Sequence, residues 1–262
     1  MEIGPASVSS IGAGGRGASQ DADRLGYFIL KRVNQAIREF QMVRDGDRIA
    51  VAVSGGKDSL GLLRLLMLRQ RSAQIRCELA AIHIRGDAGG VTPPHLPLEE
   101  WLAAQGIPYR VIEPDVREDE PIPLGCYRCT WLRRKALFLA AQQLGCNVVA
   151  FAHHADDAAQ TTLLSLFYGG TPRTVAPCAA YFGHFRVVRP LLYVPESDLV
   201  RFARASGFPA PPPTCPRGPN TRRRLVGEML KMLGRDYGRQ VRANLIRSGL
   251  RNPGCVEHST CA

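Results

Sequence analysis

The sequence lacks the features that direct a chain into a membrane or out of the cell. No apolar run approaches the roughly 18–20 residues that a membrane-spanning helix needs. The first 20 residues are rich in glycine, serine and alanine and contain neither the basic nor the apolar segment of a signal peptide. They are typical of a disordered leader. We therefore expect a cytoplasmic protein without a membrane partner.

Acidic residues are few beside the basic ones. The chain has 23 Asp and Glu against 34 Lys and Arg, which gives a formal net charge of +11 at pH 7. The imbalance is greatest from Arg217 to Arg251, where ten basic residues accompany only Glu228 and Asp236. Such a segment favours a polyanionic partner such as a phosphate backbone. Solvated helix faces explain a charge run equally well.

No internal repeat interrupts a regular alternation of strand and helix patterns. Short apolar runs at 48–53, 79–84, 109–112 and 147–152 are separated by helical patterns. This alternation predicts an α/β fold with a doubly wound, mostly parallel sheet and a smaller helical C-terminal region. We expect a disordered leader at 1–22, an α/β domain at 23–192, the helical region at 193–250 and a tail at 251–262.

The loop after the first expected strand has neither the Walker A nor the dinucleotide-binding glycine pattern. It reads Ser54-Gly55-Gly56-Lys57-Asp58-Ser59 and precedes a helix. Two glycines allow a tight turn and close approach of an anion, while backbone N–H groups and the helix N-terminus form a phosphate nest. Lys57 adds a charge, and the serines add hydroxyl donors. The loop resembles the PP-loop of ATP pyrophosphatases, in which it holds the leaving pyrophosphate of ATP.

The sequence has eight cysteines but no second C-x-x-C. Cys126 and Cys129 form the one such pair, and Cys215 lies far downstream in a proline-rich segment. In a chain without an export signal, a C-x-x-C has three interpretations: zinc, dithiol redox chemistry or iron–sulfur ligation. Cys77 and Cys146 occupy strand or helix-end positions and are expected to be small buried hydrophobic residues.

Carboxylates follow the fourth expected strand, in His153-His154-Ala155-Asp156-Asp157. In doubly wound folds, ligands bind at the carboxyl ends of the strands. Asp156 and Asp157 there suit a Mg²⁺ ion held against ATP phosphates, and both are candidate catalytic residues. Capping of the following helix explains one of the two aspartates equally well.

Taken in order, these motifs resemble the tRNA 2-thiocytidine synthetase family from about Leu25 to Leu250. The matching segments are the loop at 54–59, Cys126-x-x-Cys129 with Leu132-Arg133-Arg134, His153 to Asp157 with Gln160-Thr161, Phe167-Tyr168-Gly169-Gly170, Arg189-Pro190-Leu191 and Pro219-Asn220. The chain departs from that family at Ala152, where the family has glycine, and at Pro216-Arg217-Gly218.

The resemblance implies an enzyme that adenylates and thiolates C2 of cytidine 32 in the tRNA anticodon loop. It implies ATP and Mg²⁺ as cofactors, and a [4Fe-4S] cluster on Cys126, Cys129 and Cys215 as the sulfur carrier. Arg133, four residues past Cys129, is a candidate to steady pyrophosphate or an anionic sulfur. We expect a sulfur donor such as a cysteine desulfurase, and a homodimer is a further candidate assembly. Candidate tRNA phosphate contacts are Arg222, Arg223 and Arg224.

Three alternatives remain open at this point. One keeps thiolation but replaces the cluster by a persulfide relay among the cysteines. A second is a lysidine-type tRNA ligase with the same loop and no need for cysteines. A third is a non-catalytic, zinc-containing RNA-binding module. The tail residues Cys255, His258 and Cys261 are also candidates for a metal.

Overall fold

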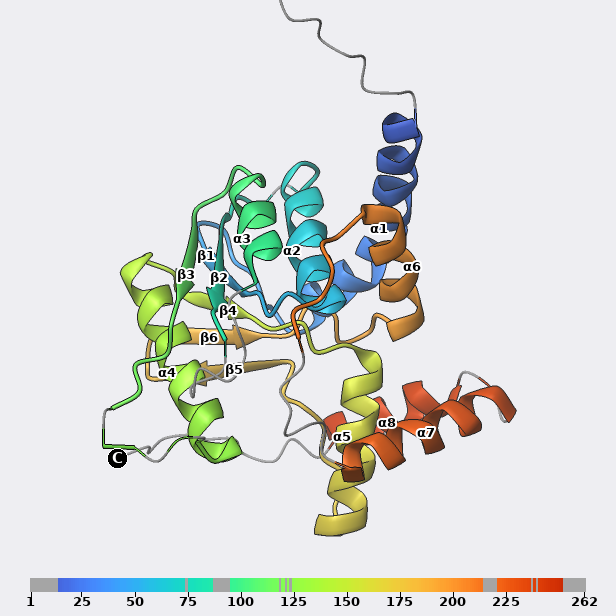
Figure 1. Ribbon diagram of the computed structural model, residues 1–262. Coiled ribbons are helices and arrows are strands. Elements are labelled where there is room, and N and C mark those ends of the chain that lie inside the picture. The colour runs from blue at the N-terminus through green and yellow to red at the C-terminus, as the bar shows by residue number, and fades with distance from the viewer. Residues whose placement is uncertain are drawn as a thin grey trace, which may run out of the picture.

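The computed structural model describes residues 14–73, 75–86, 95–117, 119–120, 122, 124–213, 221–236, 238 and 240–251 (Figure 1). Cys215 and the tail residues Cys255, His258 and Cys261 lie outside these described residues. Within the described part, no helix is both long enough and apolar enough to cross a membrane.

A six-stranded sheet forms the centre of the fold, in the order β3-β2-β1-β4-β6-β5. Five of its strands are parallel, and β5 runs antiparallel to β6 at the edge. The strands are β1 (Arg48–Ala52), β2 (Glu78–Ile84), β3 (Tyr109–Ile112), β4 (Val148–Ala150), β5 (Cys178–Tyr181) and β6 (Phe185–Val188). The doubly wound, mostly parallel α/β fold is confirmed.

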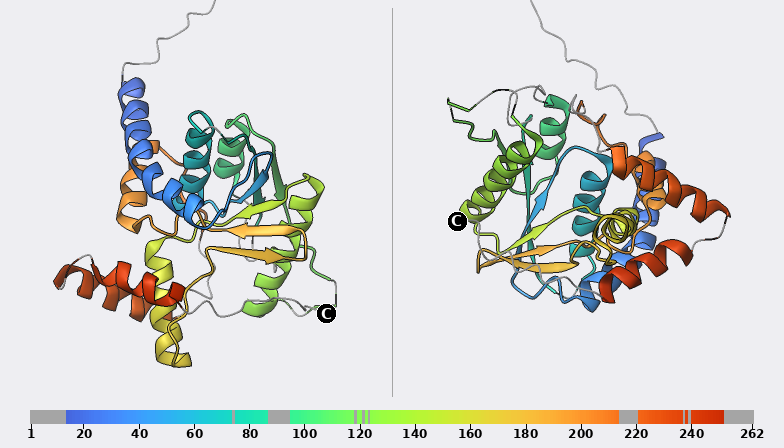
Figure 2. Two further views of the ribbon diagram at one scale, coloured as in Figure 1. Left: turned by 180° about the vertical axis from the view of Figure 1, so that it is seen from behind. Right: turned by 90° about the horizontal axis from the view of Figure 1, so that it is seen from below.

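Helices cover both faces of this sheet (Figures 1 and 2). They are α1 (Gly14–Glu39), α2 (Lys57–Gln70), α3 (Leu96–Ala103), α4 (Cys126–Gln143), α5 (Ala155–Gly169), α6 (Glu196–Ser206), α7 (Thr221–Asp236) and α8 (Gln240–Arg251). Successive strand residues point to opposite faces, so Ile49 and Val51 pack with α1, α2, α3 and α6, whereas Ala50 packs with α4.

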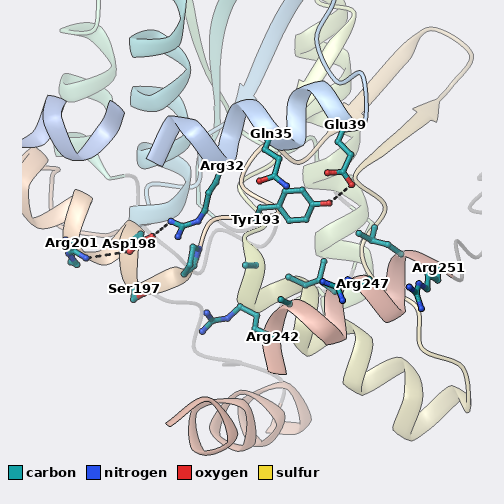
Figure 3. A pocket seen from close by; sticks show the side chains of 15 residues that line it. Arg32, Gln35, Glu39, Tyr193, Ser197, Asp198, Arg201, Arg242, Arg247 and Arg251 are labelled. Carbon is teal, nitrogen blue, oxygen red and sulfur yellow. Dashed lines mark hydrogen bonds and ion pairs between the residues drawn. The ribbon is translucent and has the colours of Figure 1, made fainter. Parts of the chain in front are cut away.

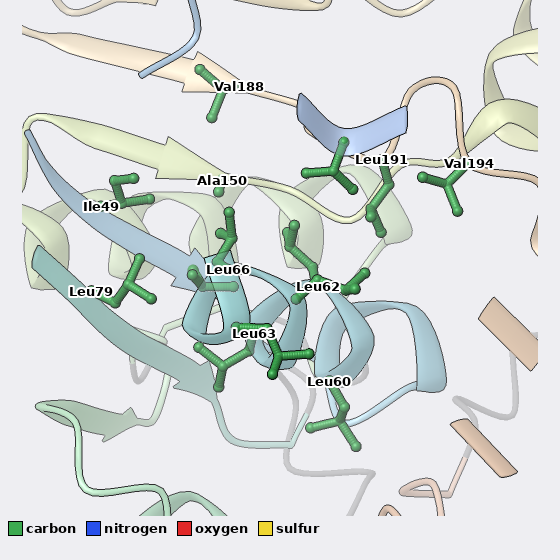
Figure 4. Packing of buried hydrophobic residues seen from close by; sticks show 14 of the residues in the cluster. Ile49, Leu60, Leu62, Leu63, Leu66, Leu79, Ala150, Val188, Leu191 and Val194 are labelled. Atoms are coloured by element: carbon green, nitrogen blue, oxygen red, sulfur yellow. The ribbon is translucent and has the colours of Figure 1, made fainter. Parts of the chain in front are cut away.

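Helix α2, which follows the loop at 54–59, is buried along most of its length. Its leucines at 60, 62, 63, 65, 66 and 68 are all buried, and Figure 4 shows several of them against the strands. A helix that is apolar on nearly every side is stable only when neighbours cover it all round. Packing among α1, α6 and the sheet provides that cover and fixes the direction in which the N-terminus of α2 points.

Two features differ from the sequence analysis. Helix α1 begins at Gly14, so residues 14–22, which we assigned to a leader, are helical. The antiparallel pair β5–β6 was not anticipated; it turns at Phe182 and Gly183, both with positive φ. Helix α6 packs on the core through Leu199 and Phe202, whereas α7 and α8 pack on α5. The proposed division of the chain at residue 192 stays a prediction.

Candidate active site

The loop from Ser54 to Ser59 joins β1 to α2 at the point where the sheet reverses its winding. Strand β1 lies between β2 and β4. The sheet continues from β1 through β2 to β3 on one side, and through β4 to β6 and β5 on the other. Ser59 Oγ accepts a hydrogen bond from the Ser54 N–H at 3.1 Å and donates to the Gly56 carbonyl at 2.9 Å. The loop is therefore closed by its own serines. It lies where α/β proteins bind ligands, at a topological switch point.

Gly55 is the position in this loop that only glycine fits. Its φ is +85°, and a Cβ atom there would lie 2.8 Å from Pro212 Cδ and 2.9 Å from Leu98 Cδ2. A side chain would be strained by the backbone and would also clash with two neighbouring segments. Close packing of these segments over the turn fixes the loop in one conformation.

Lys57 is held by two carboxylates. Its Nζ lies 3.0 Å from Asp58 Oδ2 and 3.0 Å from Glu196 Oε1, at the first residue of α6. Burial opposes the charge on Lys57, but the hydrogen bonds and charges of Glu196 and Asp58 outweigh it and raise the pKa of Lys57. Lys57 is therefore a fixed cation at the loop.

Asp58 has one oxygen without a partner. Asp58 Oδ2 accepts from Lys57, whereas Oδ1 is buried and forms no hydrogen bond with the described residues. A buried carboxylate oxygen without a donor is costly unless a ligand completes it. Asp58 therefore fits a hard cation such as Mg²⁺ better than any other carboxylate of the loop region.

A second loop, between β4 and α5, approaches the first. His154 and Asp157 form a reciprocal capping box at the start of α5, in which the His154 N–H donates to Asp157 Oδ2 at 3.1 Å. His154 Nε2 lies 3.5 Å from Asp157 Oδ2 and 3.9 Å from Asp58 Oδ2. The fold thus brings Asp157 and the nucleotide loop together around one buried histidine, although they are a hundred residues apart.

Asp156 is already occupied by donors from the C-terminal helices. One oxygen accepts from the Glu196 N–H at 2.8 Å, and the other lies 2.7 Å from Arg242 Nη2. Asp157 lies 3.5 Å from Arg223 Nη2. These contacts leave Asp156 with a structural role in joining α5, α6 and α8. Mg²⁺ binding by the Asp156–Asp157 pair stays a prediction, and the contacts of Asp156 do not favour it.

His153 is held neutral beside these charges. Burial, followed by the charge of Arg189, lowers the pKa of His153 to about 4. Its Nδ1 is buried and has no hydrogen-bond partner among the described residues. At neutral pH this ring therefore offers an uncharged nitrogen, not a cation, to the adjacent cavity.

A cavity of about 400 Å³ opens beside the nucleotide loop. One wall is apolar and includes Ile82, Ile84 and Phe151, whereas Ser54, Gly56, Asp58 and Ser59 of the loop form the opposite rim. An apolar slot next to a phosphate nest has the chemistry to bind a nucleoside and its phosphates together. We refer to it as the nucleotide cavity, and nucleotide binding there stays a prediction.

One stripe of α4 forms the remaining wall. Thr130, Arg133, Arg134 and Leu137 line the cavity. Cys126 lies one turn before Thr130, and the Thr130 hydroxyl donates to the Cys126 carbonyl at 2.8 Å. Residues at these spacings share one helix face. The stripe that borders the nucleotide cavity therefore begins with Cys126.

Cys126 and Cys129 occupy the first turn of α4. Cys126 is exposed, and Cys129 is half-buried beside Leu124, Leu132 and Trp131. Within the described residues, no group of three metal-binding side chains is present, and the third expected ligand, Cys215, lies outside those residues. Cys126 and Cys129 are therefore the described thiols of the expected cluster site.

Comparisons with known proteins decide the family. The tRNA-cytidine(32) 2-sulfurtransferase of Alkalilimnicola ehrlichii is 40% identical over 224 residues, which cover 83% of this chain and 70% of that protein. The protein of the same name from Erwinia tasmaniensis is 39% identical, over 80% of this chain and 69% of its own length. The chain belongs to the tRNA-cytidine(32) 2-sulfurtransferase family.

Two further findings agree with membership of this sulfurtransferase family. A family model described as the PP-loop domain matches residues 128–209, which contain most of α4, from its third residue on, and the His153–Asp157 loop. The solved structure of the U34-tRNA thiolase NcsA from Methanococcus maripaludis, with its [4Fe-4S] cluster, has a TM-score of 0.67 and 19% identity. The match covers 86% of this chain and 79% of NcsA. At that identity the likeness shows a shared fold.

The three consecutive arginines of this family member have different surroundings. Arg222 stacks its guanidinium over the Tyr168 ring, 4.7 Å from the centroid. Arg223 turns toward α5, where its Nε donates to Gln160 Oε1 at 3.3 Å. Arg224 is exposed. Their contact with tRNA stays a prediction, and Arg223 is better placed to fix α7 beside Asp157.

Several residues of the sulfurtransferase site were not anticipated from sequence. Glu196 pairs with Lys57, Arg242 pairs with Asp156, and Thr130 lines the cavity. A single charged residue in a helix, such as Glu196 or Arg242, has no sequence pattern that indicates its ion-pair partner. Thr130 could have been found from its spacing, because it lies four residues after Cys126.

Proposed function

We propose that this chain uses ATP to activate C2 of cytidine 32 in a tRNA anticodon loop, and that sulfur then replaces the C2 oxygen. The family name gives the reaction of the relatives. The observation that carries the proposal to this chain is the α4 stripe: Thr130 and Arg133 line the nucleotide cavity, and Cys126 lies one turn before Thr130 on the same helix face. A thiol site and an ATP site on one helix face are what coupled activation and thiolation require.

The nucleotide loop performs the first half of the reaction. Backbone N–H groups of the turn, Lys57 and the serine hydroxyls hold the β and γ phosphates of ATP. The C2 carbonyl oxygen of cytidine attacks the α-phosphorus, and the bond from that phosphorus to pyrophosphate breaks. The products are pyrophosphate and an O-adenylated base. Lys57 neutralises the charge that develops on the pyrophosphate, because its pKa is raised and it stays protonated.

In the second half, a sulfur nucleophile adds to C2 and AMP leaves with the former carbonyl oxygen. Adenylation makes this exchange feasible, because AMP is a far better leaving group than oxide. Arg133 borders the cavity and donates to the Ile84 carbonyl at 3.1 Å, so its guanidinium is held where a departing phosphate passes. The neutral ring of His153 adds no positive charge that would compete for the phosphates.

The thiols suit the cluster that the family resemblance implies. Cys126 and Cys129 would supply two thiolate ligands from one helix turn, and Cys215 is the predicted third. When bound there, a [4Fe-4S] cluster would carry the donor-derived sulfur that enters at C2. Asp58 would supply a carboxylate oxygen to Mg²⁺, which neutralises the phosphates of ATP. We further propose a cytoplasmic enzyme that receives its sulfur from a donor such as a cysteine desulfurase.

The test is mass analysis of nucleosides from tRNA treated with the anaerobically purified protein, ATP and a sulfide source. We expect 2-thiocytidine together with AMP, and none of it in a tRNA transcript that carries uridine at position 32. AMP formation without any thiolated nucleoside would contradict thiolation. Iron and sulfide analysis of the same preparation separates the cluster from a persulfide relay, because the relay needs neither element.

A further inference from the structure

A second hollow, of about 890 Å³, lies between α1, α6 and α8 (Figure 3). Five arginines line it: Arg32, Arg201, Arg242, Arg247 and Arg251. The acidic residues in its lining are Glu39 and Asp198. The hollow therefore has a net positive lining drawn from three helices. We refer to it as the arginine groove.

Both carboxylates of the arginine groove are already engaged. Asp198 lies 2.7 Å from Arg32 Nη1 and 3.7 Å from Arg201 Nη1. Glu39 accepts a hydrogen bond from the Tyr193 hydroxyl at 2.8 Å. None of the ion pairs formed within the described residues involves Arg247 or Arg251. These two cations are therefore the part of the groove that a ligand can use without breaking an existing pair.

Arg247 and Arg251 are arranged as a pair. They are exposed, lie four residues apart on α8, and therefore share one face of the helix, about 6 Å apart along its axis. Figure 3 shows both on the side of α8 that borders the groove, below α1. Two adjacent guanidinium groups at this spacing suit successive phosphates of a chain better than a single small anion.

The arginine groove is linked to the nucleotide loop by a chain of contacts. Arg242 lines the groove while its Nη2 lies 2.7 Å from Asp156 Oδ1. Asp156 in turn accepts from the backbone of Glu196, which holds Lys57. These contacts hold α8 and its arginines in a fixed position relative to the loop.

We propose that the arginine groove binds phosphates of the tRNA backbone next to the modified nucleotide, with Arg247 and Arg251 as the principal contacts. This proposal rests on the proposed function for its substrate, yet it concerns a different surface from the nucleotide cavity. Phosphate contacts of this kind fix the register of an RNA without reading its sequence.

The experiment measures tRNA affinity as a function of salt for the double variant Arg247→Ala/Arg251→Ala. The matched control is Arg71→Ala/Arg110→Ala, which removes the same charge from exposed positions just after α2 and on β3. We expect the groove variant to bind tRNA roughly ten-fold more weakly, and its plot of log affinity against log salt to be shallower by about 1.5. The control should follow the unmodified protein.

A third variant, Arg247→Lys/Arg251→Lys, guards against misfolding of the alanine protein. It keeps both charges and should recover most of the affinity and the salt slope. Equal affinity and slope in all the proteins would overturn the groove assignment, whether or not the tRNA is thiolated. Weakened binding in the alanine variant together with an absence of 2-thiocytidine in the unmodified protein would keep the groove and reject the proposed function.

Discussion

Lys57 Nζ lies 3.0 Å from Glu196 Oε1, which ties the nucleotide loop to the first residue of α6 across the mouth of the site. The pair places a carboxylate beside the cation that the phosphates of ATP are expected to contact. ATP must therefore compete with Glu196 for Lys57, and the negative charge of Glu196 also repels the triphosphate. Glu196 keeps Lys57 in position at the expense of some ATP affinity.

Replacing Glu196 by glutamine should strengthen ATP binding. The substitution keeps the shape of the side chain and removes its charge, and because the pair is partly exposed the dissociation constant should fall only about two- to five-fold. Isothermal titration with a non-hydrolysable ATP analogue measures this. Weaker binding by Glu196→Gln would show instead that the carboxylate is needed to place Lys57.

Gly55→Ala should destabilise the protein more than Gly46→Ala does. Both glycines have positive φ, but a Cβ at Gly46 meets nothing within 4 Å, whereas one at Gly55 meets Pro212 and Leu98. Gly46→Ala should cost about 1–2 kcal/mol from backbone strain alone, and Gly55→Ala about 1–3 kcal/mol more from overpacking. Urea unfolding measures both free energies. ATP binding should weaken in Gly55→Ala alone, and equal effects of the two changes would refute the packing argument.

The neutral His153 should make the protein less stable in mild acid. Its pKa is about 4 in the folded protein against an ordinary 6.5. The unfolded chain therefore takes up the proton first, and the free energy of unfolding falls as the pH drops from about 6.5 to 4, by up to about 3 kcal/mol. Above pH 6.5 this contribution is complete.

Urea unfolding across this pH range, with His153→Asn and the unmodified protein in parallel, isolates the contribution. The difference in unfolding free energy between the two should shrink as the pH falls. His184→Asn, at an exposed position on the β5–β6 turn, serves as the control and should run parallel to the unmodified protein. A constant difference for His153→Asn between pH 7 and 4 would exclude a buried neutral ring.

The sequence alone located β1 to β4 and the loop at 54–59, because both have local causes. Apolar runs predicted β1 to β4, and the glycine pair with its helix start predicted the phosphate nest. The hairpin β5–β6 was missed because each strand has only four residues and is placed by long-range pairing, β6 with β4 and β5 with β6. Glu196 and Arg242 could not be predicted, since their roles arise only when α6 and α8 pack beside α5.

Substitution of Cys126 is the most direct test of coupled activation and thiolation, because this thiol begins the α4 stripe that borders the nucleotide cavity. The measurement is the yield of 2-thiocytidine, by nucleoside mass analysis, from tRNA incubated with ATP and Cys126→Ser. Cys146→Ser is the matched control, because burial raises the pKa of that thiol to about 11 and keeps it out of the chemistry. The account predicts loss of 2-thiocytidine in Cys126→Ser and a normal yield in Cys146→Ser. A normal yield from Cys126→Ser would contradict it.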